Sequence, residues 1–588
     1  MNPPGWLVLL TLVAALALPA RAQGASSLDM VVDSCLGGYY RPGLPLPVTV
    51  ILENRGPAFQ GKLRARGQQH PFPVAEADVS LPTGSRQRYE LLLPDFPGYG
   101  GALLVQLMSG RRLVREVTRD LTPIHQANQL LVLVLAPPDK DFSSVAALDP
   151  PPQKVTPAPE LVPGQWESLR AADLIIVHDF PALGLAAEAQ TALADWTRAG
   201  GNLVLVSNLD PGEYSGSPLA ALLPLDPRGT LAVGGLTFLT GPASGGRTLI
   251  EKGGVPLLVS AYRGRGVACL VTTDVSSSDL LGEKATRDLW RQVSAEGQRA
   301  LSRWPNLDPN LSLLTRIPEI RPPDFSLFGW FLVAYVVLTG PVNYWILRRR
   351  DRMLGIFLTV PALALAFTGG AFLSGWLVRG NQVMVLEAGY LTLSSGQATA
   401  VLNERLALYS PYASTYRLTF PLDTAVQEDV SYGSGEPLVQ RLTQKVELDE
   451  VRLPMWAMRR FRLLRPRLLP GPLTLSVRRS GGRVHLRADN DTGLSLESCR
   501  LLYGGQASTP FALPPGPSDL ELSLEKQRVL TPADLDGSLA QDARNLAATI
   551  PSSDGPLLFG WCRQPLSEAQ VQGLEPVRRA LIGVFVRP

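Results

Sequence analysis

The residues best placed for chemistry are His178 and Asp179, which follow the continuous apolar run from Leu174 to Val177. Such a run is typical of a strand that is buried on both faces of a parallel sheet. In open α/β sheets, functional groups gather beyond the carboxyl ends of the strands, where an imidazole beside a carboxylate can serve as a general base. A structural role at a strand end is the alternative, because the spacing supplies no nucleophile for the pair.

Motifs that would complete a catalytic site are absent from the sequence. Neither Gly-x-Ser-x-Gly nor Gly-x-Cys-x-Gly, the tight turn that lifts a nucleophile above such a sheet, occurs in the chain. The four histidines lie far apart, and no His-x-x-x-His or Cys-x-x-Cys pair suggests zinc. We therefore expect no catalytic residues, no metal and no cofactor.

The chain has four cysteines, and two of them, Cys499 and Cys562, lie in the same C-terminal region. In an oxidising compartment these two could form a disulfide. Sequence spacing does not fix the distance between them, so both the paired and the unpaired state stay open.

Two apolar segments, 326–347 and 353–378, contain no charged side chain, and each exceeds the roughly 20 residues that a helix needs to span a bilayer. The connecting loop, 348–352, is too short to cross a membrane. Short loops rich in arginine stay cytoplasmic. We therefore predict a transmembrane hairpin with both flanking regions exported, its orientation set by the four loop arginines Arg348, Arg349, Arg350 and Arg352.

Each predicted membrane helix carries a distinctive face. Polar side chains recur at every fourth position of the first helix, and small ones do so on the second: Tyr335, Thr339 and Asn343, then Ala362, Ala366, Gly370 and Ser374. Small residues allow close approach of helices, and polar ones can bond across it. Two interpretations stay open, in which these faces pack the helices on each other or bind a partner.

The N-terminal residues 1–22 have the pattern of a signal peptide. An apolar run from Trp6 to Leu18 precedes Ala20-Arg21-Ala22, which fits the small-x-small cleavage pattern and would leave Gln23 as the first mature residue. An uncleaved signal anchor would give the same topology. Both alternatives place the region before the hairpin outside, in agreement with the arginine loop.

The region before the hairpin, which we predict to be exported, shows two kinds of hydrophobic periodicity. Residues 23–123 alternate like half-buried strands with Gly and Pro turns, which is typical of an immunoglobulin-like β-sandwich. Residues 128–305 instead contain buried apolar runs at 130–135, 174–177 and 203–206, with a helical pattern between the last two. This arrangement predicts an α/β domain.

A Pro-rich linker, 306–325, leads into the membrane hairpin. After the hairpin, residues 379–588 return to strand-like alternation, clearest in a β-hairpin between Leu473 and Ala488. The fold class that we predict is therefore a multidomain membrane protein: sandwich, α/β domain, two-helix hairpin and C-terminal β-rich domain. The formal net charge of +3 over 588 residues gives no reason to expect nucleic acid as a partner.

The hairpin also carries a resemblance. Tyr335, the run Gly340-Pro341-Val342-Asn343-Tyr344 and the basic loop resemble a family of uncharacterised bacterial membrane proteins, and Tyr40 to Gly43 and Tyr409 to Tyr412 are similar to other parts of that family. The middle domain, with Ala199-Gly200-Gly201-Asn202, is similar to class I glutamine amidotransferase-like domains. Their nucleophilic cysteine has no counterpart here, so this resemblance implies a degenerate fold and no activity.

These observations predict a non-catalytic protein anchored in the cytoplasmic membrane of a bacterium, with both large regions exported. It would bind or scaffold at the outer face of that membrane, in contact with the lipid bilayer and with other membrane or exported proteins. Two alternatives stay open: an accessory subunit of a membrane transport complex, or a hydrolase or amidotransferase-like enzyme that uses the α/β domain.

Overall fold

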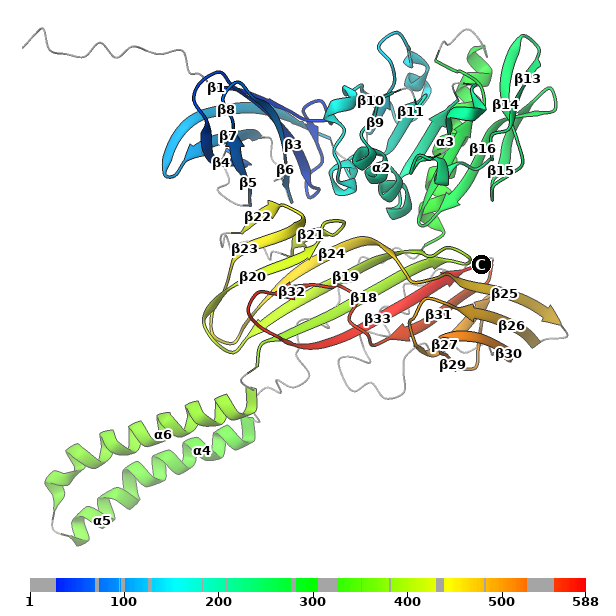
Figure 1. Ribbon diagram of the computed structural model, residues 1–588. Helices are drawn as coiled ribbons and strands as arrows, with labels where there is room; N and C mark the ends of the chain where they lie inside the picture. The colour runs from blue at the N-terminus through cyan, green and yellow to red at the C-terminus, as the bar shows by residue number, and fades with distance from the viewer. Residues whose placement is uncertain are drawn as a thin grey trace, which may run out of the picture.

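The computed structural model (Figure 1) describes residues 28–588 with gaps. The gaps are 69–72, 95, 97–100, 125–128, 182, 208, 215, 277–281, 305–324, 351, 380–381, 430–437, 481–482 and 526–554. The predicted signal peptide and almost all of the predicted linker therefore lie outside the described residues. The rest is a β-rich body from which a pair of long helices projects.

The first region pairs two sheets through one core. Strands β1 (Leu28–Asp33), β3 (Leu46–Asn54) and β6 (Arg86–Leu93) form a three-stranded sheet. The facing strands are β2 (Tyr39–Tyr40), β8 (Arg112–Pro123), β7 (Gly101–Ser109), β4 (Phe59–Gly67) and β5 (Val74–Leu81). Val48, Val50 and Leu52 point into the core with Leu63 and Val105, as the alternation of the sequence predicts.

The second of these sheets does not end at β5. It continues through β22 (Val439–Leu442), β23 (Lys445–Leu453), β20 (Ser414–Pro421) and β32 (Gln570–Val571), which gives nine strands in all. Strands β5 and β22 run parallel, with Val74 opposite Val439 and Glu76 opposite Arg441. The first sandwich and the C-terminal region therefore share one continuous sheet.

The middle region is built on a seven-stranded sheet. Its order is β10 (Pro152–Val155), β9 (Leu130–Leu135), β11 (Leu174–His178), β12 (Asn202–Val206), β17 (Gly266–Val271), β16 (Val255–Arg263) and β15 (Arg247–Lys252). The first five strands are parallel, and the last two pair antiparallel. The three apolar runs of the sequence are the central strands β9, β11 and β12, as their pattern predicts.

Helices cover both faces of this sheet. Helix α2 (Ala187–Ala199) packs Leu193 and Trp196 on one face, and α3 (Glu283–Ser302) packs Leu289 and Trp290 on the other. Short elements complete the region: 3-10 turns η1 (Ser143–Ala147), η2 (Pro159–Leu161), η3 (Trp166–Leu169), η4 (Pro211–Tyr214) and η5 (Ala220–Leu222), and the strand pair β13 (Gly229–Val233) and β14 (Leu236–Thr240).

The C-terminal region contains a twelve-stranded sheet. Its order is β21 (Ala425–Glu428), β24 (Ala457–Leu468), β19 (Thr399–Ser410), β18 (Met384–Ser394), β33 (Val577–Arg587), β31 (Leu557–Cys562), β27 (Leu496–Tyr503), β28 (Gln506–Ser508), β30 (Gly516–Glu525), β26 (Arg483–Asn490) and β25 (Leu473–Ser480), with β29 (Phe511–Leu513) beside β27. The β-hairpin predicted between Leu473 and Ala488 is β25 and β26. The last strand, β33, lies parallel to β18, the first strand after the helical hairpin.

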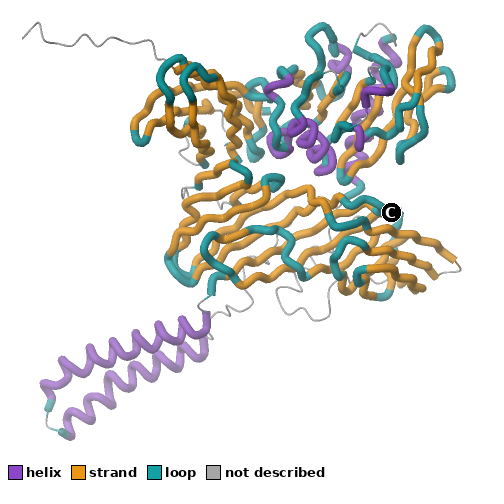
Figure 2. The backbone as a smooth tube through the Cα atoms, in the orientation of Figure 1, coloured by secondary structure: helices purple, strands orange, loops and turns teal. Residues whose placement is uncertain are grey.

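Side-chain hydrogen bonds and an ion pair connect the regions. Trp166 of the α/β region donates from Nε1 to the carbonyl of Asp423, at 2.9 Å. The buried Arg41 of the sandwich donates to the carbonyl of Ala171, at 2.8 Å, and pairs with Asp173. Figure 2 shows the result, a strand-rich body with the α/β region and the sandwich above the large sheet.

The projecting helices are the two apolar segments of the sequence. The first comprises α4 (Phe325–Val337), a π-helical turn η7 (Leu338–Val342) and α5 (Asn343–Arg349); the second comprises η8 (Met353–Gly355) and α6 (Ile356–Arg379). Pro341 lies inside this π-turn. Proline lacks the backbone N–H that a regular α-helix uses, which accounts for the irregular turn at this position. Two stretches, Gly329–Arg349 and Met353–Leu373, are long and apolar enough to cross a membrane, and they are hardly buried in the protein.

Candidate binding groove at the sheet junction

A groove lies where the two parts of the nine-stranded sheet meet. On β4, Lys62, Arg64 and Arg66 alternate with Leu63 and Ala65. Successive side chains of a strand point to opposite faces. Leu63 and Ala65 therefore enter the core of the sandwich, and the three basic side chains line the groove on the outer face.

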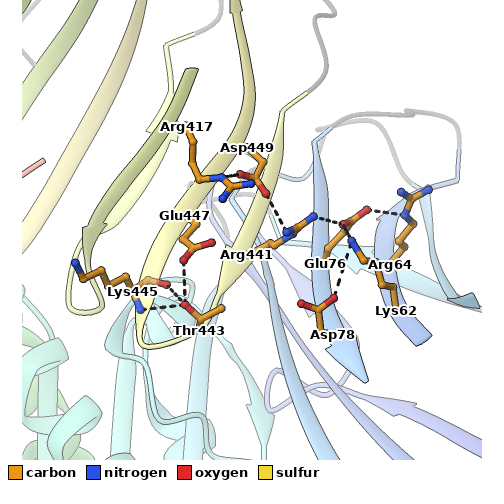
Figure 3. A network of polar contacts seen from close by, with 10 residues as sticks. All are labelled: Lys62, Arg64, Glu76, Asp78, Arg417, Arg441, Thr443, Lys445, Glu447 and Asp449. Atoms are coloured by element: carbon orange, nitrogen blue, oxygen red, sulfur yellow. Dashed lines mark hydrogen bonds and ion pairs between the residues drawn. The ribbon is translucent and has the colours of Figure 1, made fainter. Parts of the chain in front are cut away.

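Glu76 of β5 is the centre of the groove (Figure 3), and its side chain is 3% exposed. Arg64 donates from Nε to Glu76 Oε1 at 2.6 Å, and Lys62 Nζ lies 3.8 Å from Oε2. From the other part of the sheet, Arg441 Nη2 donates to Oε2 at 3.2 Å. One nearly buried carboxylate thus holds three basic groups in place.

A second acid extends the network along the C-terminal strands. Asp449 of β23 is nearly buried, forms an ion pair with Arg441 at 3.1 Å (Nη1 to Oδ2), and accepts a hydrogen bond from Arg417 of β20. Arg441 therefore bridges Glu76 and Asp449, and it does so with one planar group, since a guanidinium has five donors in a fixed fork. Arg64 and Arg417 are about half-exposed, whereas Arg441 is 24% exposed.

The groove has a volume of about 900 Å³ and carries more positive than negative charge. Six basic and three acidic side chains line it: Lys62, Arg64, Arg66, Arg417, Arg441 and Arg452 against Glu76, Asp449 and Glu450. Arginine forks match carboxylate and phosphate oxygens. The excess of three positive charges therefore favours binding of an extended anionic ligand.

A second hollow of about 730 Å³ continues the groove between β20 and the connection from β32 to β33. Arg417 and Gln572 line both hollows, and the second adds Lys445 and Arg578. Acids are present here too, as Glu447 and Glu575. The basic surface is therefore a strip along β20 rather than a single point.

Sequence reasoning missed this site. The alternation of Lys62, Arg64 and Arg66 with apolar residues was a readable signal for one basic strand face. The other half, however, comes from Arg417, Arg441 and Asp449, and Arg441 is 365 positions away from Glu76. Strand pairing over that separation has no local signal.

The predicted pair, His178 and Asp179, lies at the carboxyl end of β11 but makes different contacts from those expected. His178 is buried, and its Nε2 lies 3.2 Å from Asp274 Oδ1, a residue that follows β17. Asp179 instead has a left-handed backbone, with φ of 51°, and its N–H donates to the carbonyl of Val206. The acid beside the imidazole is therefore Asp274 and not the sequence neighbour.

Asp274 is already fully engaged. Lys140 Nζ lies 2.8 Å from its Oδ2, and the backbone N–H of Ser276 donates to Oδ1. Burial raises the pKa of Asp274, but the hydrogen bonds from His178, Lys140 and Ser276 outweigh it and hold that pKa well below its usual range. Within the described part of the chain, Nδ1 of His178 has no hydrogen-bond partner.

The predicted polar face of the first projecting helix lies against the second helix. Asn343 is buried there, and its Nδ2 donates to Thr359 Oγ1 at 2.9 Å. The ring of Tyr335 lies 5.2 Å from that of Phe367. The hydroxyl of Thr339 instead donates to the carbonyl of Tyr335 in its own helix, at 2.6 Å.

The small residues of the second helix divide between two sides. Gly370 faces the first helix, since a Cβ added there would lie 3.5 Å from Phe331 Cζ. Ala362 and Ala366 are exposed and point away from the contact, while the side chain of Ser374 is outside the described set. Among the members of this stripe whose side chains are described, Gly370 is the one that lies at the helix contact.

The loop arginines and the two cysteines have simple placements. Arg348 and Arg349 lie over the rings of Tyr344 and Trp345, at 5.9 and 5.1 Å, and Arg350 and Arg352 are exposed. Cys499 and Cys562 are buried free thiols, so the disulfide considered from the sequence is absent.

The register explains the missing bridge. A Cβ added to Gly560 of β31 would lie 2.7 Å from Cys499 Sγ, so Cys499 is opposite Gly560, two residues before Cys562. Two residues span about 6.6 Å along a strand, and together with the spacing of about 4.8 Å between strands this exceeds the reach of a disulfide. Among the residues that the structure describes, no group of three His, Cys, Asp or Glu side chains could hold a metal ion.

Comparisons with known proteins cover parts of the chain. Residues 27–121, which contain the first sandwich, match a domain of unknown function, DUF8726. No curated protein matches the chain. The solved structure of cytoplasmic protein STM1381 from Salmonella typhimurium LT2 is 16% identical, covers 30% of this chain and 98% of its own, and has a TM-score of 0.22. Exo-beta-1,4-mannosidase Op5Man5 from Opitutaceae bacterium strain TAV5 is 13% identical, with coverages of 29% and 35% and a TM-score of 0.19.

Proposed function

We propose that this chain is a non-catalytic binding protein that is anchored by its two-helix hairpin in the cytoplasmic membrane of a bacterium. Its large regions are exported, and its ligand is an extended anion that carries phosphate or carboxylate groups. The binding site is the groove at the junction of β5 and β22. The α/β region, with its suggested likeness to amidotransferases, is a structural support in this proposal.

The observation that carries the proposal is the arrangement of charge in the groove. Glu76 and Asp449 are nearly buried and hold Arg64, Arg417 and Arg441 in fixed positions. Preorganised arginines lose little freedom when a ligand binds. Because the bases outnumber the acids, the network alone leaves the groove positive.

The non-catalytic part of the proposal is supported by the surroundings of His178. Its Nε2 faces Asp274, which is also paired with Lys140. A carboxylate shared in this way holds the imidazole in place. An activity screen in which the His178→Ala variant loses a hydrolase or amidase activity of the wild-type chain would overturn this part.

The test of the binding site is titration of the purified full chain in detergent with inorganic polyphosphate, with neutral dextran as the uncharged control. We expect binding that weakens as salt is added, because screening acts on charge pairs in open grooves. Arg64→Gln and Arg417→Gln should each weaken binding about tenfold, which corresponds to about 1.4 kcal/mol.

The matched control is Arg478→Gln, which removes an exposed arginine from β25, a strand outside the nine-stranded sheet. Thermal unfolding of each variant checks that the groove is still folded. Equal weakening by all three substitutions, or polyphosphate binding that salt does not affect, would contradict the proposal.

A further inference from the structure

Exposed apolar side chains gather at the edge of the β-rich body where the chain leaves α6. The carbonyl of Val383, which follows that helix, accepts a hydrogen bond from the backbone N–H of Val577 at 3.0 Å. Nearby, Tyr412 and Leu574 are exposed, and both line a hollow of about 470 Å³ together with Val383 and Val577. Contiguous exposed apolar surface marks an interaction site.

The turn between β23 and β24 belongs to the same edge. It consists of Pro454, Met455 and Trp456, and Met455 is 47% exposed. Trp456 has a left-handed backbone, with φ of 58°, which is uncommon for a bulky side chain. Its ring lies 6.2 Å from the ring of Phe372 in α6.

The position of Phe372 sets the depth of this turn. Phe372 comes about two helical turns, or about 10 Å, before the end of α6 at Arg379. It lies inside the stretch Met353–Leu373 that is apolar enough to span a membrane. The turn with Trp456 therefore reaches alongside the apolar part of the helix and does not stop at its end.

We propose that the turn 454–456 and the adjoining turn that carries Tyr412 are inserted into the outer leaflet of the bilayer. The occupant of this apolar edge is lipid, at the boundary between headgroups and acyl chains. Tryptophan and tyrosine favour that layer, because their rings are apolar and their N–H or O–H groups are polar. This inference rests on the proposed membrane span of the hairpin, with which the apolar edge is continuous.

Insertion would fix the distance of the binding groove from the membrane surface. Tyr416 lines both the hollow at the membrane edge and the groove at the sheet junction. A body held in the leaflet by two turns as well as by the hairpin cannot rotate freely relative to the membrane. The basic strip along β20 would then open close to the lipid surface.

The test uses single cysteines labelled with an environment-sensitive fluorophore, in the full chain reconstituted into phosphatidylcholine vesicles with brominated acyl chains. Labels go to Met455→Cys in the turn, Leu358→Cys on the lipid-facing side of α6, and Leu113→Cys on β8 of the sandwich. All three parent side chains are exposed, and the four natural cysteines are buried, so the label should go to the new thiol.

We expect bromolipid quenching at positions 455 and 358 and none at 113. Quenching at 358 alone would overturn the inserted turn and leave the membrane span intact. Absence of quenching at both 455 and 358 would overturn the span as well. Quenching at 113 would show that the label itself seeks lipid, and it would also contradict the inference.

A second measurement avoids the label. The chain has ten tryptophans, and replacing one by phenylalanine removes its share of the emission. Trp456→Phe should reduce the part of the emission that brominated lipid quenches. Trp196→Phe, which changes a buried residue of α2, should reduce the total emission and leave the quenchable part unchanged. If the emission that brominated lipid quenches were equal in wild type and Trp456→Phe, the inference would be wrong.

Discussion

Arg441 Nη2 lies 3.2 Å from Glu76 Oε2, although the two residues are 365 positions apart in the chain. This contact crosses the strand pair that joins the N-terminal sandwich to the C-terminal region, β5 and β22. The same guanidinium holds Asp449 through Nη1. Arg441 therefore connects the buried acid of the sandwich, Glu76, with the buried acid of the C-terminal region, Asp449.

Replacing Arg441 with methionine should destabilise the protein by about 1 to 3 kcal/mol, the usual effect of losing hydrogen bonds between charged groups. Glu76 would keep Lys62 and Arg64, which limits the loss. The control is Arg452→Met at the exposed rim, where an ion pair contributes about 1 kcal/mol or less. Thermal unfolding in detergent measures both, and an equal shift in Tm would contradict the role of Arg441.

Glu167 should make stability depend on pH. It is buried in η3 without a hydrogen-bond partner at Oε1. Burial raises its pKa from 4.5 to about 8, opposed by the charge of Arg170 and a hydrogen bond at the backbone of Val426. A raised pKa means that the folded state binds the proton more tightly, so this stability is present below pH 4.5 and is lost as pH rises toward about 8.

The Glu167→Gln variant cannot ionise at this position. Its Tm should therefore fall less than that of the wild type between about pH 5 and pH 8, by the equivalent of up to a few kcal/mol. Glu188→Gln, which alters an exposed residue of α2 in the same region, is the control. Parallel pH profiles for wild type and Glu167→Gln would show that the carboxyl group is not kept protonated by burial.

The sequence predicted those parts of the fold that have a local period. The apolar runs of β9, β11 and β12 and the alternation of β25 and β26 lie within single elements, so their patterns can be read directly. The pairing of β5 with β22 and the contact of His178 with Asp274 join residues far apart in the chain. No spacing rule carries that information, which is why the groove and the contact of His178 with Asp274 were not predicted.

The helix faces show the same division. Asn343 and Tyr335 were predicted to share a face, and they do contact the second helix, at Thr359 and Phe367. Of the small-residue stripe, Ala362 and Ala366 are exposed and do not pack on the first helix, so a partner-binding face stays open for them. Small side chains mark where helices can approach closely, but the larger Phe367 takes part in the contact itself.

The arginine loop should decide the orientation of the hairpin. Replacing Arg348, Arg349, Arg350 and Arg352 together with asparagine removes the positive charge that holds a short loop in the cytoplasm, and mixed topology or poor insertion should follow. Lysine at the same four positions keeps the charge and should keep the wild-type orientation. Reporter fusions at Ala398 and Asp351 measure both sides, and unchanged topology of the asparagine variant would mean that the loop does not set the orientation.

Gly370 should limit how closely the two helices of the hairpin pack. A Cβ at this position would lie 3.5 Å from Phe331 Cζ, an ordinary contact, so Gly370→Ala should leave the hairpin unchanged. Gly370→Leu adds branched atoms toward Phe331 and should push the helices apart, since lipid offers no apolar driving force to restore the contact. The matched control is Ala362→Leu, because Ala362 is exposed on the outer side of α6. Crosslinking between cysteines placed on the two helices should fall for Gly370→Leu only; a fall for Ala362→Leu would instead show that the outer side of α6 is the tightly packed one.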